Sequence, residues 1–308
     1  MALLSFKRKP TEMAETSAEL EQFLQGYSIE VMPRTAGKIE RFQNILPKET
    51  RVYIAHIEGT PIENMVETAS RLASEGYTVM PHFPARIIKD KATLENWIDM
   101  YQGEADVKQA LLLAGGVTAP HGVFENSMQL LETELFDAKG FDHLHVAGHP
   151  EGNKDIDPDG SLKKVDAALS WKQQFSERTD AKMALTTQFA FDARPIIDWV
   201  NGLKASGIDI PVHIGIAGPA KLQTLIKFAI ACGVGPSLKV LQKRAMDVTK
   251  LLLPYEPIDV LTALAMHKAK NSDFNIDQVH FFPLGGIKTN ANWVTDNGGR
   301  AGVPAAYS

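Results

Sequence analysis

The sequence predicts an α/β protein, a (β/α)8 TIM barrel with extra helices between strands seven and eight. Eight short apolar segments, rich in β-branched and aromatic residues, are bounded by turn signals. Helical patterns lie between most of them, and this alternation is typical of a parallel sheet with helical crossovers. Eight such units close a barrel. The competing fold, an open doubly wound sheet, usually has fewer strands, and no GxGxxG follows the first segment.

The predicted strands are short and follow one another along most of the chain. They cover residues 27–32, 51–57, 77–83, 109–115, 143–148, 183–191, 211–218 and 278–285.

The helices between these strands are predicted from apolar residues at helical spacing. Residues 61–76, 125–140, 193–207 and 220–233 have this pattern, and each segment ends at a glycine, a common helix stop. Residues 169–175 are expected to start the helix after strand five. Between strands seven and eight, the pattern of residues 240–270 predicts two extra helices, which are separated at Pro254 and Pro257.

All 308 residues are expected to form one catalytic domain, and their 44% hydrophobic content is enough for a large core. The barrel covers about 26–286, preceded by an N-terminal helical extension, 1–25. The Gly- and Asn-rich tail, 287–308, is expected to be irregular.

Charge and composition exclude several classes of partner. The net charge is −5 and no long basic run occurs, which argues against nucleic acid and anionic membranes. The N-terminus is no secretory signal and no apolar run reaches membrane-spanning length, so we expect a cytoplasmic protein. The single Cys232 excludes internal disulfides and multi-cysteine metal sites, and we expect it to be a buried thiol. A homo-oligomer is left open.

Active sites of such barrels gather at the C-terminal ends of the strands. A lone polar residue there would mean little, but most of the predicted strands end in polar or glycine residues that packing alone does not explain. These residues are Glu30, His56, Glu58, His82, Gly115, Gly116, His149, Glu151, Asn153, Gln188, Gly285 and Gly286.

Two loops after the strands are candidate ligand contacts. The loop 114–122 is glycine-rich, which suits a flat ring or a phosphate, although a tight turn explains it as well. The loop 149–164 is long and polar, so it holds a charged ligand or is a solvated surface loop. We expect no metal, because no HExxH or HxH pair lies at the strand ends; the HLH at 143–145 lies at a strand's start.

The order of IEVMPRT, MPHF, LLLAGG, GHPEGN, WKQQF, TTQFAFD and IGIAGP resembles the methylenetetrahydrofolate reductase family. The resemblance covers roughly residues 26–286, the catalytic barrel of bacterial-type members. It implies an enzyme of one-carbon metabolism and methionine biosynthesis that binds FAD. NADH or NADPH is the implied electron donor, and the implied reaction interconverts 5,10-methylenetetrahydrofolate and 5-methyltetrahydrofolate.

The resemblance also implies roles for single residues. Glu30 matches the family's general acid, which protonates a folate nitrogen, and Gln188 matches a residue that touches substrate. A carboxyl in that role needs an enclosed apolar setting, which favours its protonated form. The implied cofactor-binding residues are His56, His82, Gly115, Gly116, His149, Asn153, Trp171 and Lys172. Among these, His82 matches the histidine beside the flavin, whereas His56, His149 and Asn153 replace other family residues.

The sequence departs from the family at several ligand positions. Family members commonly have Arg-Gly-Asp after strand four, where this chain has Ala114-Gly115-Gly116. Leu222 stands where a phenylalanine stacks on ligands. Lys288 is a candidate for the positive charge that faces the folate tail. Both are expected substrate contacts.

Three functions therefore remain open from the sequence. The first is the flavin-dependent reductase, with Glu30 as general acid. The second is a related enzyme with an altered redox partner: one that oxidises methyltetrahydrofolate, uses no NAD(P)H, or needs no flavin. The third is a folate- or flavin-binding subunit that needs a partner for activity.

Overall fold

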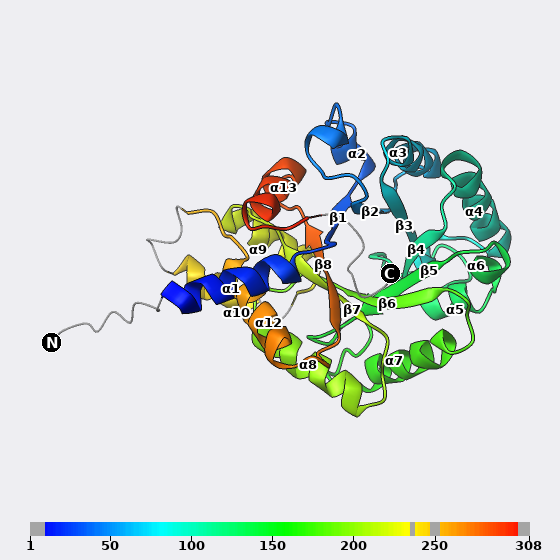
Figure 1. Ribbon diagram of the computed structural model, residues 1–308. Coiled ribbons are helices and arrows are strands. Elements are labelled where there is room, and N and C mark those ends of the chain that lie inside the picture. Colours follow the sequence, from blue (N-terminus) through cyan, green and yellow to red (C-terminus); the bar gives the residue numbers. More distant parts are fainter. Residues whose placement is uncertain (1–9, 235–237, 247–252, 301–308) are drawn as a thin grey trace.

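The computed structural model confirms the predicted barrel. Eight parallel strands are paired in chain order, and the last pairs with the first through Ser28–His280 and Ile29–Phe281 to close the ring (Figure 1). The structure describes residues 10–234, 238–246 and 253–300. The strands are β1 (Ser28–Val31), β2 (Arg51–Ile54), β3 (Thr78–Pro84), β4 (Gln109–Leu113), β5 (His143–Gly148), β6 (Lys182–Thr187), β7 (Val212–Ala217) and β8 (Ile276–Phe282).

Helices surround the ring of strands on all sides (Figure 1). Two of them, α10 and α12, are the extra helices predicted on either side of Pro254 and Pro257. The helices are α1 (Pro10–Phe23), α2 (Pro33–Ala36), α3 (Ile62–Ser74), α4 (Lys91–Ala105), α5 (Ser127–Leu131), α6 (Leu135–Ala138), α7 (Lys163–Ser176), α8 (Ala193–Ala205), α9 (Leu222–Ala231), α10 (Leu238–Ala245), α12 (Ile258–Lys270) and α13 (Ile287–Asp296).

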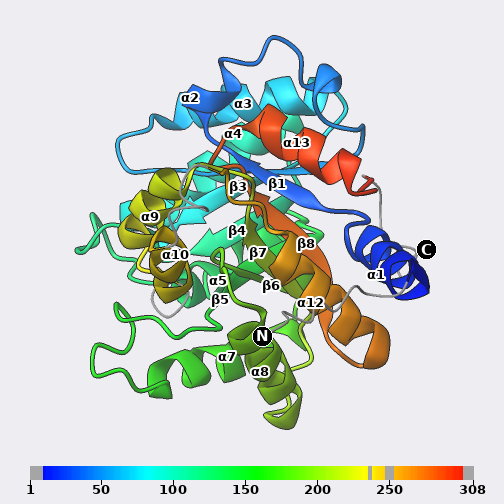
Figure 2. The ribbon, with the colours of Figure 1, turned by 90° about the vertical axis from the view of Figure 1, so that its left-hand side faces the viewer.

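The two ends of the barrel carry different elements. In Figure 2 the strands run from right to left, so α9, α10 and the long loop after β5 lie at their C-terminal ends. We call this end the mouth. The opposite end, the base, carries α1, and there the Gly26 amide donates to the Arg300 carbonyl at 2.8 Å.

Most of the apolar core lies between the strands and the helices. Helix α3 shows how the sequence builds this layer: Met65, Val66, Ala69 and Leu72 recur at helical spacing and are all buried. The strands supply the other side of the layer through alternate residues, such as Ile29 and Val31 of β1.

The inside of the barrel is unusually polar. The residues of β1 between its apolar ones, Ser28 and Glu30, point inward, where they meet His280 of β8. Among the described residues, Tyr53, Met80 and Leu111 form a small apolar cluster that is separate from the main core. Because side chains alternate across a strand, Glu30 does not disturb the apolar layer at all.

The C-terminal tail was predicted wrongly in part. Residues 287–296 are not irregular but form α13, whose Ile287, Ala291 and Val294 are buried against the barrel and whose Trp293 ring lies 6.3 Å from that of Phe281. The asparagines in this segment are poor helix formers, but burial of one apolar face outweighs intrinsic propensity.

Three smaller expectations are also corrected. The helix expected at 125–140 is split into α5 and α6 by Glu134, whose φ is +59°. Residues 169–175 do not start a helix but lie in the second half of α7, which begins at Lys163. Cys232 is exposed, because it follows the last turn of α9 and lies outside the apolar layer.

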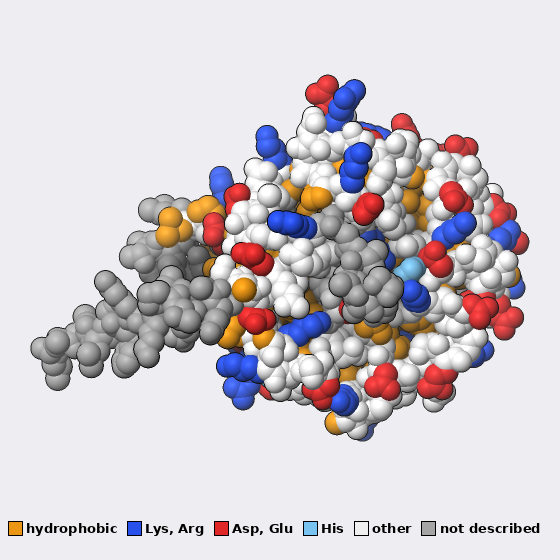
Figure 3. Space-filling view, in the orientation of Figure 1, with side chains coloured by type: hydrophobic (Ala, Val, Ile, Leu, Met, Phe, Trp, Pro, Cys, Tyr) orange, Lys and Arg blue, Asp and Glu red, His pale blue; other side chains and the backbone are white. Residues whose placement is uncertain are grey.

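The outer surface carries charges of both signs. Figure 3 shows the base, where acidic and basic side chains are spread around the rim and no large area is of one sign. Within the described ranges no helix has the length and apolarity needed to cross a bilayer.

Candidate functional site

A carboxylate and two histidines meet at the mouth. Glu30 Oε2 lies 3.4 Å from His82 Nε2 and 3.9 Å from His280 Nε2. The Glu30 side chain is 19% exposed and the His280 side chain is fully buried. The structure thus brings together Glu30 and His82, both predicted, and adds His280. The two histidine Nε2 atoms are buried and have no hydrogen-bond partner among the described residues, so each can still bond to a ligand.

Burial keeps His82 neutral near pH 7. It lowers the pKa of this imidazole to about 4, although the Glu30 carboxylate acts in the opposite direction. A neutral imidazole can donate to a carboxylate or accept from a carboxylic acid, so His82 is compatible with both protonation states of Glu30.

His56 lies close to this cluster, just after β2. Its Nε2 lies 2.9 Å from the Thr60 carbonyl oxygen, so that nitrogen carries the proton and donates. The ring lies 5.0 Å from that of Trp97, and burial lowers its pKa. Its Nδ1 is buried without a partner in the described chain and is left as an acceptor.

A buried lysine lies beneath the loop after β5. Lys172 Nζ donates to the Ala147 carbonyl at 2.7 Å, and burial lowers the pKa of this amine to about 8. His149 lies close enough for the ammonium group to act on it: its pKa falls to about 4, mainly through burial and further through Lys172. The sequence predicted both residues in one cofactor site, and the structure places them together.

The loop 149–162 is ordered by its own side chains. Asn153 Oδ1 accepts from the amides of Asp155 and Ile156, so this residue shapes a turn. The buried Asp157 carboxylate accepts from the Lys164 and Val165 amides at the start of α7. This polar loop therefore caps a helix rather than lying loosely on the surface.

Arg86 joins three loops at the mouth. It follows β3, and its guanidinium donates to the carbonyls of Val117 and Glu125 in the loop after β4. It also pairs with Asp155 in the loop after β5, at 2.8 Å. Arg86 was not among the residues predicted for the site. Its position restores one positive charge close to Ala114-Gly115-Gly116, where the family resemblance leads one to expect an arginine.

The two glycines after β4 differ in their surroundings. Gly115 has φ +98° and a Cβ there would lie 3.0 Å from Pro84 Cβ, so this backbone requires glycine. Gly116 has nothing within 4 Å of the position of a Cβ. The loop after β4 thus presents open backbone at the mouth, as a flat ring would require.

Four predicted site residues do not join the cluster of Glu30, His82 and His280. Gln188 follows β6 at the mouth, but it is exposed and its Oε1 accepts from the Phe189 amide. Lys288 is exposed in the first turn of α13, and Leu222 is buried in a second apolar cluster around α9. Trp171 is partly buried in α7 and stacks on Phe175, with the ring centroids 5.4 Å apart.

Apart from Arg86, the residues that the sequence reasoning missed lie inside the barrel. Tyr53, His145, His213 and His280 are all buried and come from β2, β5, β7 and β8. The available signal was polarity at alternate strand positions, as in Gln278 and His280, which places such side chains on the inner face. Attention to strand ends alone passed over them.

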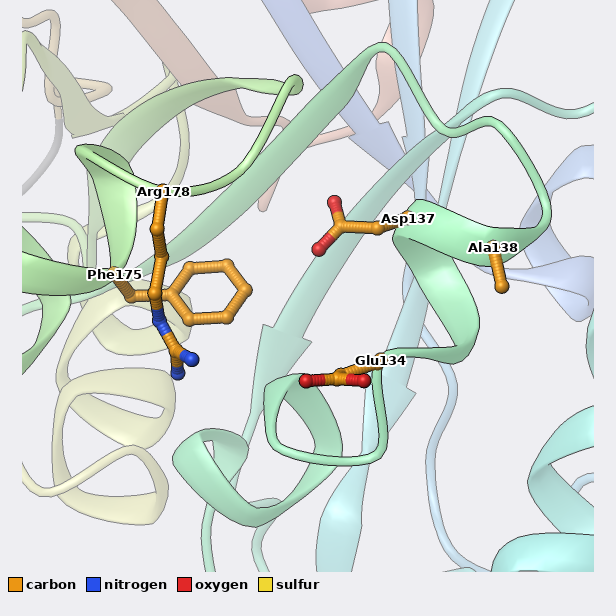
Figure 4. A pocket seen from close by; sticks show the side chains of 5 residues that line it. All are labelled: Glu134, Asp137, Ala138, Phe175 and Arg178. Carbon is orange, nitrogen blue, oxygen red and sulfur yellow. The ribbon is translucent and has the colours of Figure 1, made fainter.

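Two hollows lie on the surface outside the Glu30 cluster. Among the described residues no three His, Cys, Asp or Glu side chains are grouped to hold a metal ion. A surface hollow of about 240 Å³ lies between α6 and α7 and is lined by Glu134, Asp137, Ala138, Phe175 and Arg178 (Figure 4). A second hollow, of about 390 Å³, is lined by Lys91, Val123, Phe124, Gln129, Glu132 and Thr133. Neither includes a residue of the Glu30 cluster, which remains the site with the more distinctive chemistry.

Comparison with known proteins supports the fold. No protein-family model matches the chain. Among solved structures, the chain is similar to an uncharacterized protein from Clostridium thermocellum that binds two copies of 5-methyl-5,6,7,8-tetrahydrofolic acid. The TM-score is 0.56 and the identity 9%, over 91% of this chain and 98% of that one. At this identity the likeness is one of fold.

Proposed function

We propose that this protein is a flavin-dependent oxidoreductase that interconverts 5,10-methylenetetrahydrofolate and 5-methyltetrahydrofolate. The observation that carries the proposal is the position of Glu30, a partly buried carboxyl at the mouth that faces His82 and His280. The sequence resemblance to methylenetetrahydrofolate reductases supports it, as does the fold shared with a protein that binds 5-methyltetrahydrofolic acid.

The residues at the mouth fit a flat heteroaromatic cofactor with polar edges. His56 Nδ1 and His82 Nε2 are buried polar atoms in need of a partner. The backbone at Gly116 is open to close approach. When bound, a flavin would supply hydride transfer, and the chain's own residues would supply orientation and a proton. His56, His82, Gly115, Gly116 and His149 are the residues that would hold it.

Glu30 supplies the proton in this proposal. Reduction of the methylene group opens a five-membered ring: one C–N bond breaks, and the freed nitrogen keeps the electron pair and takes one proton from the Glu30 carboxyl. One hydride completes the methyl group, so a proton and a hydride balance the reaction. In the reverse direction the Glu30 carboxylate receives the proton. Either way His82, being neutral, stabilises Glu30 without adding a charge.

The experiment combines spectroscopy with product analysis. Purified protein is mixed with FAD, and retention of a flavin absorption band is measured after the free cofactor has been removed. Turnover of methylenetetrahydrofolate with NADH or NADPH is then followed as methyltetrahydrofolate formed. The proposal expects retained flavin and product; loss of all flavin would contradict it.

A second candidate function is folate binding without flavin. The similar protein from C. thermocellum binds two copies of the folate, and the loop at Ala114-Gly115-Gly116 lacks the charges expected beside a flavin. In this case the isolated chain needs a partner or a different redox donor. Isothermal titration with 5-methyltetrahydrofolate distinguishes the two: two sites per colourless chain favour the second candidate, whereas one site in a flavin-loaded chain favours the first.

A further inference from the structure

The interior of the barrel contains a file of proton-exchanging groups that begins at Glu30 and ends at the base. We propose that this file returns protons to Glu30 during turnover and connects it to solvent at the base of the barrel. We call it the interior chain: Glu30, His280, Ser28, Tyr53, His145, His213 and Asp277. The inference rests on the proposed function, since it concerns how the acid of that reaction is restored.

The upper part of the interior chain runs through His280. This fully buried ring places Nε2 at 3.9 Å from the Glu30 carboxylate and Nδ1 at 2.9 Å from the Ser28 hydroxyl oxygen. The ring of Tyr53 lies 4.2 Å from it, centroid to centroid. His280 therefore has one nitrogen toward the mouth and the other toward the interior. That arrangement lets an imidazole accept a proton on one side and release one on the other.

Tyr53 connects the upper part to two further histidines. Its hydroxyl oxygen lies 2.6 Å from His145 Nδ1 and 3.5 Å from His213 Nδ1. The rings of these histidines are 4.5 Å apart and meet edge to face. Because a phenol both donates and accepts, the Tyr53 hydroxyl joins the groups above it to those below.

The lower end of the interior chain reaches solvent through Asp277. His213 Nε2 lies 3.6 Å from Asp277 Oδ2, and the Asp277 side chain is 20% exposed. Asp277 is the extra residue of a bulge in β8, because Val212 and His213 pair with Ile276 and Gln278. A bulge re-aims a side chain, and here it brings a carboxylate at the base next to an interior histidine.

Burial keeps the middle of this file uncharged at rest. It lowers the pKa of His213 to about 4, lowers that of His145 well below its usual value, and raises that of Tyr53. Arg51 at the base adds to the lowering for both histidines, whereas Asp277 opposes it for His213. A charged form of any of these side chains is therefore only transient, because an unpaired charge is unfavourable in a buried environment.

The proton balance is simple. At the mouth an O–H bond forms at Glu30 as an N–H bond breaks at His280 Nε2. His280, Ser28, Tyr53 and His213 each give one proton upward and take one from below, and Asp277 takes the last from water; His145 bonds the Tyr53 hydroxyl from the side and has no net change. No group of the interior chain is oxidised or reduced. A ligand lying across the mouth closes the direct solvent route to Glu30, and the interior route stays available.

The test uses two tyrosines with matched chemistry. Tyr53→Phe removes the bridging hydroxyl from the middle of the file and leaves the mouth untouched. Tyr101→Phe is the control, because this residue of α4 is also fully buried and its hydroxyl has no partner in the described chain. We expect Tyr53→Phe to lower kcat for methylenetetrahydrofolate by about tenfold, to leave KM unchanged, and to increase the solvent deuterium isotope effect. Tyr101→Phe should change neither quantity.

A second variant tests the relay independently, in case Tyr53→Phe fails to fold. Asp277→Asn interrupts proton entry at the partly exposed base, and Asp273→Asn, a nearby exposed carboxylate paired with Lys204, is its control. Asp277→Asn should also raise the isotope effect. Wild-type isotope effects in both Tyr53→Phe and Asp277→Asn would overturn the relay.

Histidine ¹⁵N NMR separates failure of the relay from failure of the proposed function. Without ligand, we expect Tyr53→Phe to change the ring ¹⁵N shifts of His145, which the Tyr53 hydroxyl contacts, and also those of His280, whose ring lies 4.2 Å from that of Tyr53 and whose Nδ1 bonds Ser28. An unchanged His280 would overturn the interior chain whether or not the protein turns over folate. Absence of wild-type turnover, with His280 responding, would overturn the proposed function alone.

Discussion

Glu30 is a charged residue on a strand of only four residues, and strand geometry explains how it is accommodated. Its neighbours Ile29 and Val31 point into the apolar layer, while Glu30 points into the barrel toward His82 and His280. The position at the last inward-facing residue of β1 places the carboxyl at the mouth. One alternating pattern thus supplies both a core contact and a candidate acid.

Glu30→Gln keeps the shape of the side chain and removes the exchangeable proton. We expect folate turnover to fall by about 10²–10⁴-fold, the usual contribution of a general acid, with the fold and FAD binding retained. Circular dichroism and the flavin band check the fold and the cofactor, and methyltetrahydrofolate formation checks the rate. Glu67→Gln, an exposed carboxyl on α3, is the matched control. Near-normal turnover in Glu30→Gln would refute the assigned role.

At the scale of elements, the loops at the mouth are held together by Arg86. This one side chain bonds the loop after β4 through two carbonyls and the loop after β5 through Asp155. Because the Arg86 side chain is only 16% exposed, these bonds are less screened than those of a surface pair.

Arg86→Gln should loosen the loop 149–162. We expect faster amide hydrogen exchange at residues 153–157 and little change in the strands, since local opening depends on local contacts. Asp155→Asn removes only the ion pair and should give a smaller effect. Arg194→Gln, which breaks an exposed pair with Asp198 on α8, is the control. Equal exchange in Arg86→Gln and the control would show that Arg86 does not order the loop.

Helix α13 owes its formation to one apolar face. Trp293→Ala removes a large side chain that is 8% exposed and packs near Phe281. We expect a loss of about 3–5 kcal/mol in the free energy of unfolding, measured by urea denaturation. Asn292→Ala, on the exposed face of the same helix, should change stability by less than about 0.5 kcal/mol. A similar small effect of both would mean that α13 does not contribute to the core.

At the scale of the whole molecule, buried histidines make the fold sensitive to acid. Burial lowers the pKa of His82, His149 and His213 to about 4, and it lowers that of His145 well below its usual value. In the unfolded chain these groups bind protons near pH 6.5. Between about pH 6.5 and 4 the unfolded state therefore binds more protons, so the stability that these histidines contribute is present above pH 6.5 and is lost as the pH falls.

Urea denaturation at several pH values tests this. We expect the free energy of unfolding to fall by about 1.4 kcal/mol per pH unit for each such histidine below pH 6. His213→Gln should make the slope shallower by about one histidine's share. A free energy of unfolding that is constant between pH 6.5 and 4.5 would contradict the burial of these rings in neutral form.

The sequence was sufficient for the fold because strand–helix alternation is a repeated, strongly patterned signal. The ends of elements were less certain: α13 was missed because Asn and Thr mask an apolar face that only the barrel can bury. At the site, strand ends led to Glu30, His82 and His149, and the family resemblance added Lys172, which lies beside His149. They did not lead to Tyr53 or His280, whose neighbours come from other strands and depend on the barrel's register.

The central claim is that Glu30 exchanges a proton with folate at the mouth while a hydride is transferred. The most direct measurement is the anaerobic mixing of FAD-loaded protein with 5-methyltetrahydrofolate, followed through the flavin absorption band. The account predicts that the band bleaches in wild-type protein and bleaches about 10²–10⁴-fold more slowly in Glu30→Gln. A band that stays unbleached in wild-type protein, or equal rates in the two, would contradict it.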